Sequence, residues 1–403
     1  MARYLPLRLE KRDYIQISSI FSVSLGIFVT INIWFHHDII PVFDANWYKF
    51  IAESGYIFNG DYQFQQNVAF LPLYPKLVSM LKWLPMGTGW IMLAVSAFVS
   101  WLSSVIYYDL IKRYFDSKIA IKTVSLFLLG PFSMYLFNGY SEALFILLSV
   151  FILHLLIVSR AYRSAAFVVA LASIDRQYGI FLSFLVLLPY LVENRNHPEK
   201  LLNISSADNI YLIGFICGSG LLAFTFYEFL VFRDPFLFAH ILGAWGFVDI
   251  SFSFVQMLMG KGIIPGIVVF FKEGVSNPAG VGAVLFSAMI VMTFINRKKL
   301  PLLMSLYVLI MGCVMYFLSI GAAPGSYINA GRYALVLFPG WLALTVFIYS
   351  LFKGGVKESD GAYGEIAIRA VNIADILYWM ILLTGVVLLI TYTVRFVQGQ
   401  WVS

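Results

Sequence analysis

The sequence predicts an all-α protein that crosses a membrane many times, and two observations support this prediction. Of the 403 residues, 61% are hydrophobic and only 12% are charged, whereas a soluble domain has about 25% charged residues and about 45–50% apolar ones. The apolar residues also gather into runs of about 20, the length at which a helix crosses the hydrocarbon core of a bilayer. The composition therefore excludes a water-soluble enzyme and predicts an integral membrane protein.

Charge and cysteine content exclude two further classes. The net charge is +6, but the basic residues are scattered among apolar runs and form no patch that could follow a phosphate backbone. A nucleic-acid partner is therefore not expected. The two cysteines lie in apolar segments and have neither disulfide nor zinc spacing.

Eleven apolar segments along the chain are candidate membrane spans. They are residues 15–35, 87–111, 117–136, 141–159, 163–175, 177–192, 209–232, 279–295, 301–320, 333–352 and 373–394. The fifth is short and meets the sixth at Asp175-Arg176, so we interpret these two as a tight hairpin whose tip reaches the interface. All eleven are expected to form one transmembrane domain over residues 1–403.

The first span predicts the orientation. Its apolar run is about 20 residues long and no small-residue cleavage site follows it, so it is expected to stay as an anchor rather than act as a signal peptide. With the N-terminus in the cytoplasm, most of the 27 Lys and Arg residues fall on the cytoplasmic side, as the positive-inside rule requires. An odd number of crossings then places the C-terminus outside. The short cytoplasmic loops favour a prokaryotic plasma membrane over the endoplasmic reticulum.

Two long connections, residues 36–86 and 233–278, fall on the outer side. Both are aromatic and apolar with only occasional charges, which is typical of helices lying flat in the membrane interface. Residues 70–84 are too short to span and are broken by prolines, so they predict an interfacial or re-entrant element. Any chemistry is expected at this outer face.

Asp44 is the first candidate functional residue. It precedes a stretch with apolar residues at helical spacing, including Trp47 and Ile51, and Gly55 is a natural end for that helix. The position suits an N-cap, which contributes about 1 kcal/mol. It also suits a carboxylate held at the membrane boundary as a general base, and spacing alone leaves both interpretations open.

Three more charged residues interrupt apolar segments. Glu142 opens a helix, where it either favours the helix dipole or faces a cavity. Asp175 and Arg176 break an apolar run, which indicates either a functional site or a mutual ion pair. Arg332 begins another apolar helix, as a phosphate ligand or as an anchor that reaches toward water.

The histidines do not predict a metal site. His240 is single, with no ligand at helical spacing, and the aromatic residues around it are typical of interfacial anchors. His36, His37 and Asp38 are consecutive, but helical spacing does not bring both imidazoles to one face.

Six short motifs in order resemble the PIG-V mannosyltransferase family and its prokaryotic relatives. The first family pattern is W/F-D-x-x-W/H-Y-x-x-I-A-x-x-G-Y. In chain order the matching segments are Phe43 to Tyr56, Ala69 to Pro75, Tyr140 to Phe145, Arg176 with Gly179, Asp234 to His240, and Arg332 to Pro339. The chain departs from the pattern at Asp175, where Thr or Ser is usual, and at Phe43, where Trp is more typical.

The resemblance implies a GT-C-type membrane glycosyltransferase. Such enzymes move a sugar, here expected to be mannose, from a polyprenyl-phosphate sugar to a glycan or glycolipid hydroxyl on the outer side, with inversion. Asp44 would be the base, with Glu142 as a second catalytic carboxylate. Arg332, Arg176 and Tyr333 would bind the donor phosphate.

The same resemblance assigns other residues to substrate contact. These are Trp47, Tyr48, Asn67, Tyr74, Gln177, His240 and Trp245. No metal or other cofactor is expected to be required, because arginines can neutralise a lipid-phosphate leaving group and the sequence has no Asp-x-Asp triplet. We expect the outer face to hold one cavity lined by Asp44, Glu142, Arg176 and Arg332.

Two other function classes stay open. A polytopic protein with intramembrane charges could be a solute or lipid transporter, although no inverted repeat is visible in the sequence. It could also be a noncatalytic subunit of a glycosyltransferase complex. Activity retained after Asp44→Asn would favour both over the enzyme.

Overall fold

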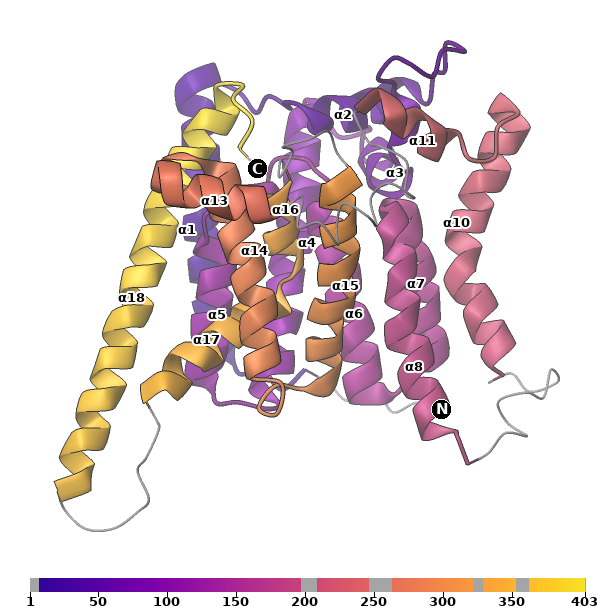
Figure 1. Ribbon diagram of the computed structural model, residues 1–403. Coiled ribbons are helices and arrows are strands. Elements are labelled where there is room, and N and C mark those ends of the chain that lie inside the picture. The colour runs from indigo at the N-terminus through magenta and orange to yellow at the C-terminus, as the bar shows by residue number, and fades with distance from the viewer. Residues whose placement is uncertain (1–6, 197–208, 246–262, 322–328, 353–361, 403) are drawn as a thin grey trace.

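The protein is helical throughout the part of the chain that can be described. The computed structural model describes residues 7–196, 209–245, 263–321, 329–352 and 362–402, and no β-strand occurs within these ranges. The helices stand side by side as a bundle (Figure 1). The predicted all-α membrane fold is confirmed.

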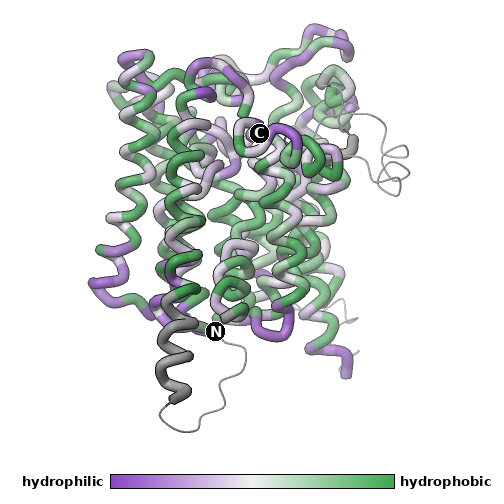
Figure 2. The backbone as a smooth tube through the Cα atoms, turned by 60° about the vertical axis from the view of Figure 1, so that its left-hand side comes forward, coloured by the Kyte–Doolittle hydropathy of each residue, from purple (hydrophilic) through white to green (hydrophobic). Residues whose placement is uncertain are grey.

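Within the described ranges, six helices are long and apolar enough to cross a membrane. They are α1 (Lys11–His36), α4 (Thr88–Lys112), α6 (Glu142–His154) with its π-helical continuation η3 (Leu155–Ser159), α10 (Ile210–Phe232), α14 (Pro278–Ile295) and most of α18 (Ala362–Val397). Figure 2 shows hydrophobic residues along the bundle and hydrophilic ones gathered toward its two ends.

A bent pair of helices is a candidate for a seventh span. Helix α16 (Ala330–Val336) and helix α17 (Pro339–Phe352) meet at 82°, where the sequence predicted one continuous span. Pro339 has no backbone N–H to continue the first helix, and it opens α17 instead. The break leaves the short helix α16 to carry Arg332.

The predicted number of eleven spans is not confirmed. The remaining helices of the bundle are α5 (Ser117–Leu129), α7 (Tyr162–Asp175), α8 (Ser183–Glu193) and α15 (Leu302–Gly321). A helix rises 1.5 Å per residue, so the 13 and 14 residues of α5 and α7 reach only about 20 Å of a core about 30 Å thick. Helices α5 and α7 therefore complete the bundle without reaching the length of a full span.

The turn at Asp175 differs from the predicted hairpin. After α7 the chain continues as the 3₁₀ helix η4 (Gln177–Leu182) and enters α8. Asp175 is only 1% exposed, so its carboxylate is not exposed at the turn, while the predicted position of the turn at the membrane interface stays a prediction. The acid lies within the protein, where its neighbours are side chains rather than water.

Short helices from the two long connections gather at one end of the bundle (Figure 1), and the side of the membrane that this end faces stays a prediction. Their bounds are α2 (Asp44–Ser54), η1 (Asn67–Ala69), α3 (Leu73–Met80), α11 (Leu237–His240), η5 (Ile241–Trp245), α13 (Ile263–Glu273) and η6 (Gly274–Ser276). Gly55 ends α2 with a φ of 80°, a conformation that costs glycine little. One further 3₁₀ turn, η2 (Ser133–Leu136), lies between α5 and α6.

Candidate active site

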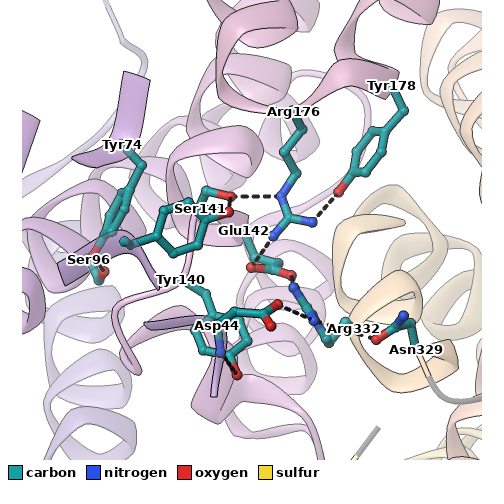
Figure 3. A network of polar contacts seen from close by, with 11 residues as sticks. Asp44, Tyr74, Ser96, Tyr140, Ser141, Glu142, Arg176, Tyr178, Asn329 and Arg332 are labelled. Carbon is teal, nitrogen blue, oxygen red and sulfur yellow. Dashed lines mark hydrogen bonds and ion pairs between the residues drawn. The ribbon is translucent and has the colours of Figure 1, made fainter. Parts of the chain in front are cut away.

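Four charged side chains from distant parts of the chain meet at the end of the bundle where the short helices lie. Asp44 is the first residue of α2, Glu142 is the first residue of α6, Arg176 follows α7, and Arg332 lies in α16. Figure 3 shows their charged groups pointing toward one another. The predicted meeting of these four residues is confirmed, while a cavity lined by them and their chemical roles stay predictions.

Arg332 is held between two carboxylates. Its Nη1 donates to Oδ2 of Asp44 at 2.8 Å, and its Nε donates to Oε1 of Glu142 at 2.6 Å. The Arg332 side chain is 8% exposed. A buried guanidinium needs such partners, because removing it from water without them is costly.

Glu142 also binds the second arginine. Its Oε2 lies 2.5 Å from Nη2 of Arg176, and its side chain is 1% exposed. Glu142 therefore bridges Arg176 and Arg332 and does more than favour a helix dipole, while its predicted place facing a cavity stays a prediction.

Arg176 completes the network on the far side of Glu142. Its Nε donates to Oγ of Ser141 at 2.9 Å, and its Nη1 donates to the hydroxyl of Tyr178 at 2.8 Å. The alternative of an Asp175–Arg176 ion pair is wrong. Both carboxylate oxygens of Asp175 are buried and have no hydrogen-bond partner among the described residues.

Asp44 is not an N-cap. Phe43 occupies that position, and no side chain caps the helix. The carboxylate of Asp44 instead turns to Arg332, because a charged partner attracts it more strongly than a backbone amide does. Its side chain is 16% exposed, more than that of Glu142.

Aromatic rings surround the Arg332 guanidinium. Its central carbon lies 4.7 Å from the ring centre of Tyr140, 5.7 Å from that of Tyr135 and 5.8 Å from that of Trp401. These distances suit cation–π contacts. Trp401 was not predicted from the sequence, because it follows the last helix and belongs to no motif. Tyr333, predicted to bind phosphate, is buried beside Arg332 in the same helix.

Several residues predicted to contact substrate have partners within the protein. Tyr48 shares a hydrogen bond with Ser141 at 2.8 Å, and Tyr74 shares one with Ser96 at 2.8 Å. Asn67 accepts from the amide of Ile57 at 3.0 Å and donates to the carbonyl of Gly55 at 2.9 Å. These contacts organise the connection between α1 and α4.

Trp47 and Gln177 lie close to the network in sequence. Trp47 stacks on Phe70 with ring centres 6.2 Å apart. Gln177 follows Arg176 at the start of η4 and is half-buried. Their predicted contact with substrate stays a prediction.

His240 belongs to a separate polar group that joins the connection before α4 to the connection after α10. Its Nδ1 lies 2.8 Å from Oδ2 of Asp234, and the hydroxyl of Tyr62 donates to the same oxygen at 3.1 Å. Burial opposes ionisation of Asp234, but hydrogen bonds from His240, a backbone amide and Tyr62 lower its pKa overall. Trp245 ends η5, and its side chain lies outside the described residues.

The residues considered for metal binding have other contacts. The His36 ring makes a 2.8 Å hydrogen bond to the carbonyl of Val397, and Asp38 accepts from the indole of Trp90 at 2.7 Å. No group of three His, Cys, Asp or Glu side chains with metal-binding geometry occurs within the described ranges. Metal independence itself remains a prediction.

Comparison with known proteins gives one family and a set of similar folds. The model of the family "Mannosyltransferase (PIG-V)" matches residues 17–258. No curated protein gives a significant match.

The oligosaccharyltransferase of Archaeoglobus fulgidus in its apo form is similar in structure. It is 14% identical with a TM-score of 0.51, and the match covers 96% of this chain and 56% of that one. The chain thus spans about half the length of that relative. ArnT from Cupriavidus metallidurans bound to undecaprenyl phosphate is 13% identical with a TM-score of 0.47, covering 96% of this chain and 76% of that one. At such identities the likeness to the oligosaccharyltransferase shows the fold alone.

Proposed function

The chain belongs to the mannosyltransferase (PIG-V) family. From this membership we propose that it transfers a sugar from a polyprenyl-phosphate sugar to a hydroxyl group of a glycan or glycolipid. We propose mannose as the sugar. One observation supports this proposal above the others. Arg332 is bound between Asp44 and Glu142, at the end of the bundle where the short helices lie (Figure 1). Cationic and acidic groups for transfer from a phosphate thus stand beside each other at one membrane face.

The donor suits this architecture. A polyprenyl chain needs an apolar environment, which the membrane-spanning helices supply, while its phosphate needs positive charge near the membrane boundary. Arg332 and Arg176 provide that charge, and a guanidinium fork matches phosphate oxygens with two parallel hydrogen bonds.

The reaction balances with these groups alone. The acceptor oxygen attacks the anomeric carbon and forms the new C–O bond, while the bond from that carbon to the phosphate oxygen breaks. The acceptor proton passes to Asp44, and the electron pair leaves with the lipid phosphate. Attack opposite the leaving group inverts the anomeric centre. Negative charge that grows on the phosphate is stabilised by the arginines.

Asp44 fits the base better than Glu142 does. Asp44 has one arginine partner and a side chain that is 16% exposed, while Glu142 lies between two arginines with 1% exposure. A carboxylate stabilised by two guanidinium groups has little tendency to accept a proton. We therefore interpret Glu142 as the residue that positions Arg176 and Arg332.

The donor phosphate must compete with Asp44 for Arg332. Asp44 binds Nη1 of Arg332, one of the nitrogens that would face a phosphate. When phosphate takes that nitrogen, the Asp44 carboxylate is released and becomes available as a base. The same event thus seats the donor and frees the proton acceptor.

The experiment is transfer by the purified protein in nanodiscs, supplied with polyprenyl-phosphate mannose and a glycolipid acceptor. Appearance of the glycosylated acceptor with release of polyprenyl phosphate supports the proposal. Movement of the intact donor between leaflets without cleavage would show a transporter instead. Activity only after addition of a second protein would indicate a noncatalytic subunit.

A further inference from the structure

We propose that residues 396–402, at the end of α18 and beyond it, hold Asp44 in the position from which it acts as the base. This inference rests on the proposed function. It assigns positioning roles to Phe396 and Trp401, which lie far in sequence from Asp44 and outside residues 17–258, the part matched to the family.

The backbone before Asp44 is in a conformation that phenylalanine rarely adopts. Phe43 has a φ of 51° and a ψ of −124°, on the left-handed side where only glycine is unstrained. Such a conformation persists only where surrounding contacts hold it, and it is found most often beside functional groups. The strained backbone of Phe43 therefore requires neighbouring groups that hold its side chain in place, and we call these groups the clamp.

Two rings of the 396–402 segment supply that clamp. The ring of Phe43 packs edge-on against Trp401 with ring centres 5.0 Å apart, and it packs at a tilt against Phe396 with ring centres 5.5 Å apart. Trp401 also lies 5.8 Å from the guanidinium carbon of Arg332. One indole therefore contacts both the residue that aims Asp44 and the arginine that Asp44 binds.

The chain reaches this position because the end of α18 is fixed and then reverses. The His36 ring bonds the carbonyl of Val397 at 2.8 Å, which ties α18 to the end of α1. Gly399 follows with a φ of 80°, and the amide of Gln400 returns to the carbonyl of Arg395 at 2.9 Å. The segment is packed rather than loose, since Val402 is fully buried.

A further contact links the same segment to the backbone of Asp44. The amide of Asp44 donates to the hydroxyl of Tyr140 at 3.3 Å, and the Tyr140 ring packs on Phe396 with centres 6.0 Å apart. The amide of Asp44 is thus held by Tyr140, which packs on Phe396, and the side chain of Phe43 is held directly by residues of the segment 396–402. Displacing this segment should let the Asp44 carboxylate drift from its place.

Trp401→Ala tests the proposal in the full-length protein. A shift of about 1 Å in a reacting group can cost about 100-fold in rate, so we expect kcat to fall by about 10-fold or more with the donor KM changing less. Trp401→Phe keeps a ring against Phe43 and should recover most of the rate. Trp379→Ala is the control, since Trp379 lies on α18, the helix that precedes Trp401, is 54% exposed, and its replacement should leave kcat unchanged.

A double-mutant cycle separates positioning from a general structural role. If Trp401 acts through Asp44, then Trp401→Ala should have almost no further effect on single-turnover transfer in an Asp44→Asn background. Equal losses in both backgrounds would overturn the proposal, as would a wild-type rate for Trp401→Ala. If Asp44→Asn itself transfers at the wild-type rate, the proposed base is wrong, which is a different outcome.

Phe43→Gly keeps the proposal testable if Trp401→Ala does not fold. Glycine adopts the Phe43 conformation without strain, so thermal stability should be retained while kcat falls because the clamp is lost. A wild-type kcat for Phe43→Gly would overturn the proposal.

Discussion

Replacing Asp44 with Asn removes a negative charge and a proton acceptor while the side-chain volume stays nearly the same. The carboxylate accepts a 2.8 Å hydrogen bond from Arg332 and does not cap its helix, so the substitution should leave α2 intact. General-base catalysis contributes about 10²–10⁴-fold to a rate. We expect single-turnover transfer by Asp44→Asn to fall by about that factor.

The same substitution should strengthen binding of the lipid phosphate. A hydrogen bond to a charged group contributes about 1.5–3 kcal/mol and one between neutral groups about 0.5–1.5 kcal/mol. The contact that competes with phosphate for Arg332 therefore weakens by about 1 kcal/mol. That difference corresponds to an affinity gain of about fivefold.

The assay combines equilibrium binding of polyprenyl phosphate with single-turnover transfer in the same nanodiscs. Glu53→Gln is the matched control, because it changes a carboxylate to an amide on the same helix, where Glu53 accepts a hydrogen bond from Thr88. This control should change neither quantity. A wild-type transfer rate for Asp44→Asn would show that Asp44 is not the base, and Glu142 would be tested next. A lost rate with unchanged phosphate affinity would refute the competition for Arg332.

Three further predictions concern the same network. Arg332→Ala should weaken polyprenyl-phosphate binding by about 10-fold or more, since it removes charge-assisted hydrogen bonds. Arg332→Lys should recover only part of that affinity, because an ammonium group lacks the planar fork of a guanidinium. Equal affinity of the alanine variant and the wild type would show that Arg332 does not bind the phosphate. Glu142→Gln should destabilise the protein by about 3 kcal/mol or more, because two buried guanidinium groups lose their shared carboxylate. Thermal unfolding in detergent measures this loss, and an unchanged unfolding midpoint would contradict the bridging role of Glu142. Transfer should persist in EDTA, because the arginines can neutralise the leaving phosphate; complete loss that manganese or magnesium restores would reverse this prediction.

The sequence predicted which residues gather at the site better than it predicted the ion pairs between them. Charged residues at the outer ends of apolar segments indicated that Asp44, Glu142, Arg176 and Arg332 share one membrane face, and the structure brings them together. The sequence could not predict which side chains pair, since Arg176 forms an ion pair with Glu142 and not with its neighbour Asp175. Side-chain pairing depends on which helices pack together, and adjacency in sequence does not decide that.

The role of Phe43 and Trp401 was beyond sequence reasoning for a related reason. The left-handed backbone of Phe43 is not a local preference of phenylalanine. It is held by rings that arrive from the other end of the chain. The span number is not confirmed for a simpler reason: an apolar segment of 13 or 14 residues looks like a membrane span in composition, while its helix is shorter than a full span.

The most direct test of the central claim is cleavage of a polyprenyl-phosphate sugar by the purified protein. With polyprenyl-phosphate mannose and a glycolipid acceptor as the only substrates, we expect one polyprenyl phosphate released for each sugar transferred. The product should have the inverted anomeric configuration, and Asp44→Asn should abolish most of the release. Release that is the same for wild type and Asp44→Asn, or transfer that requires a nucleotide sugar as the donor, would contradict the account.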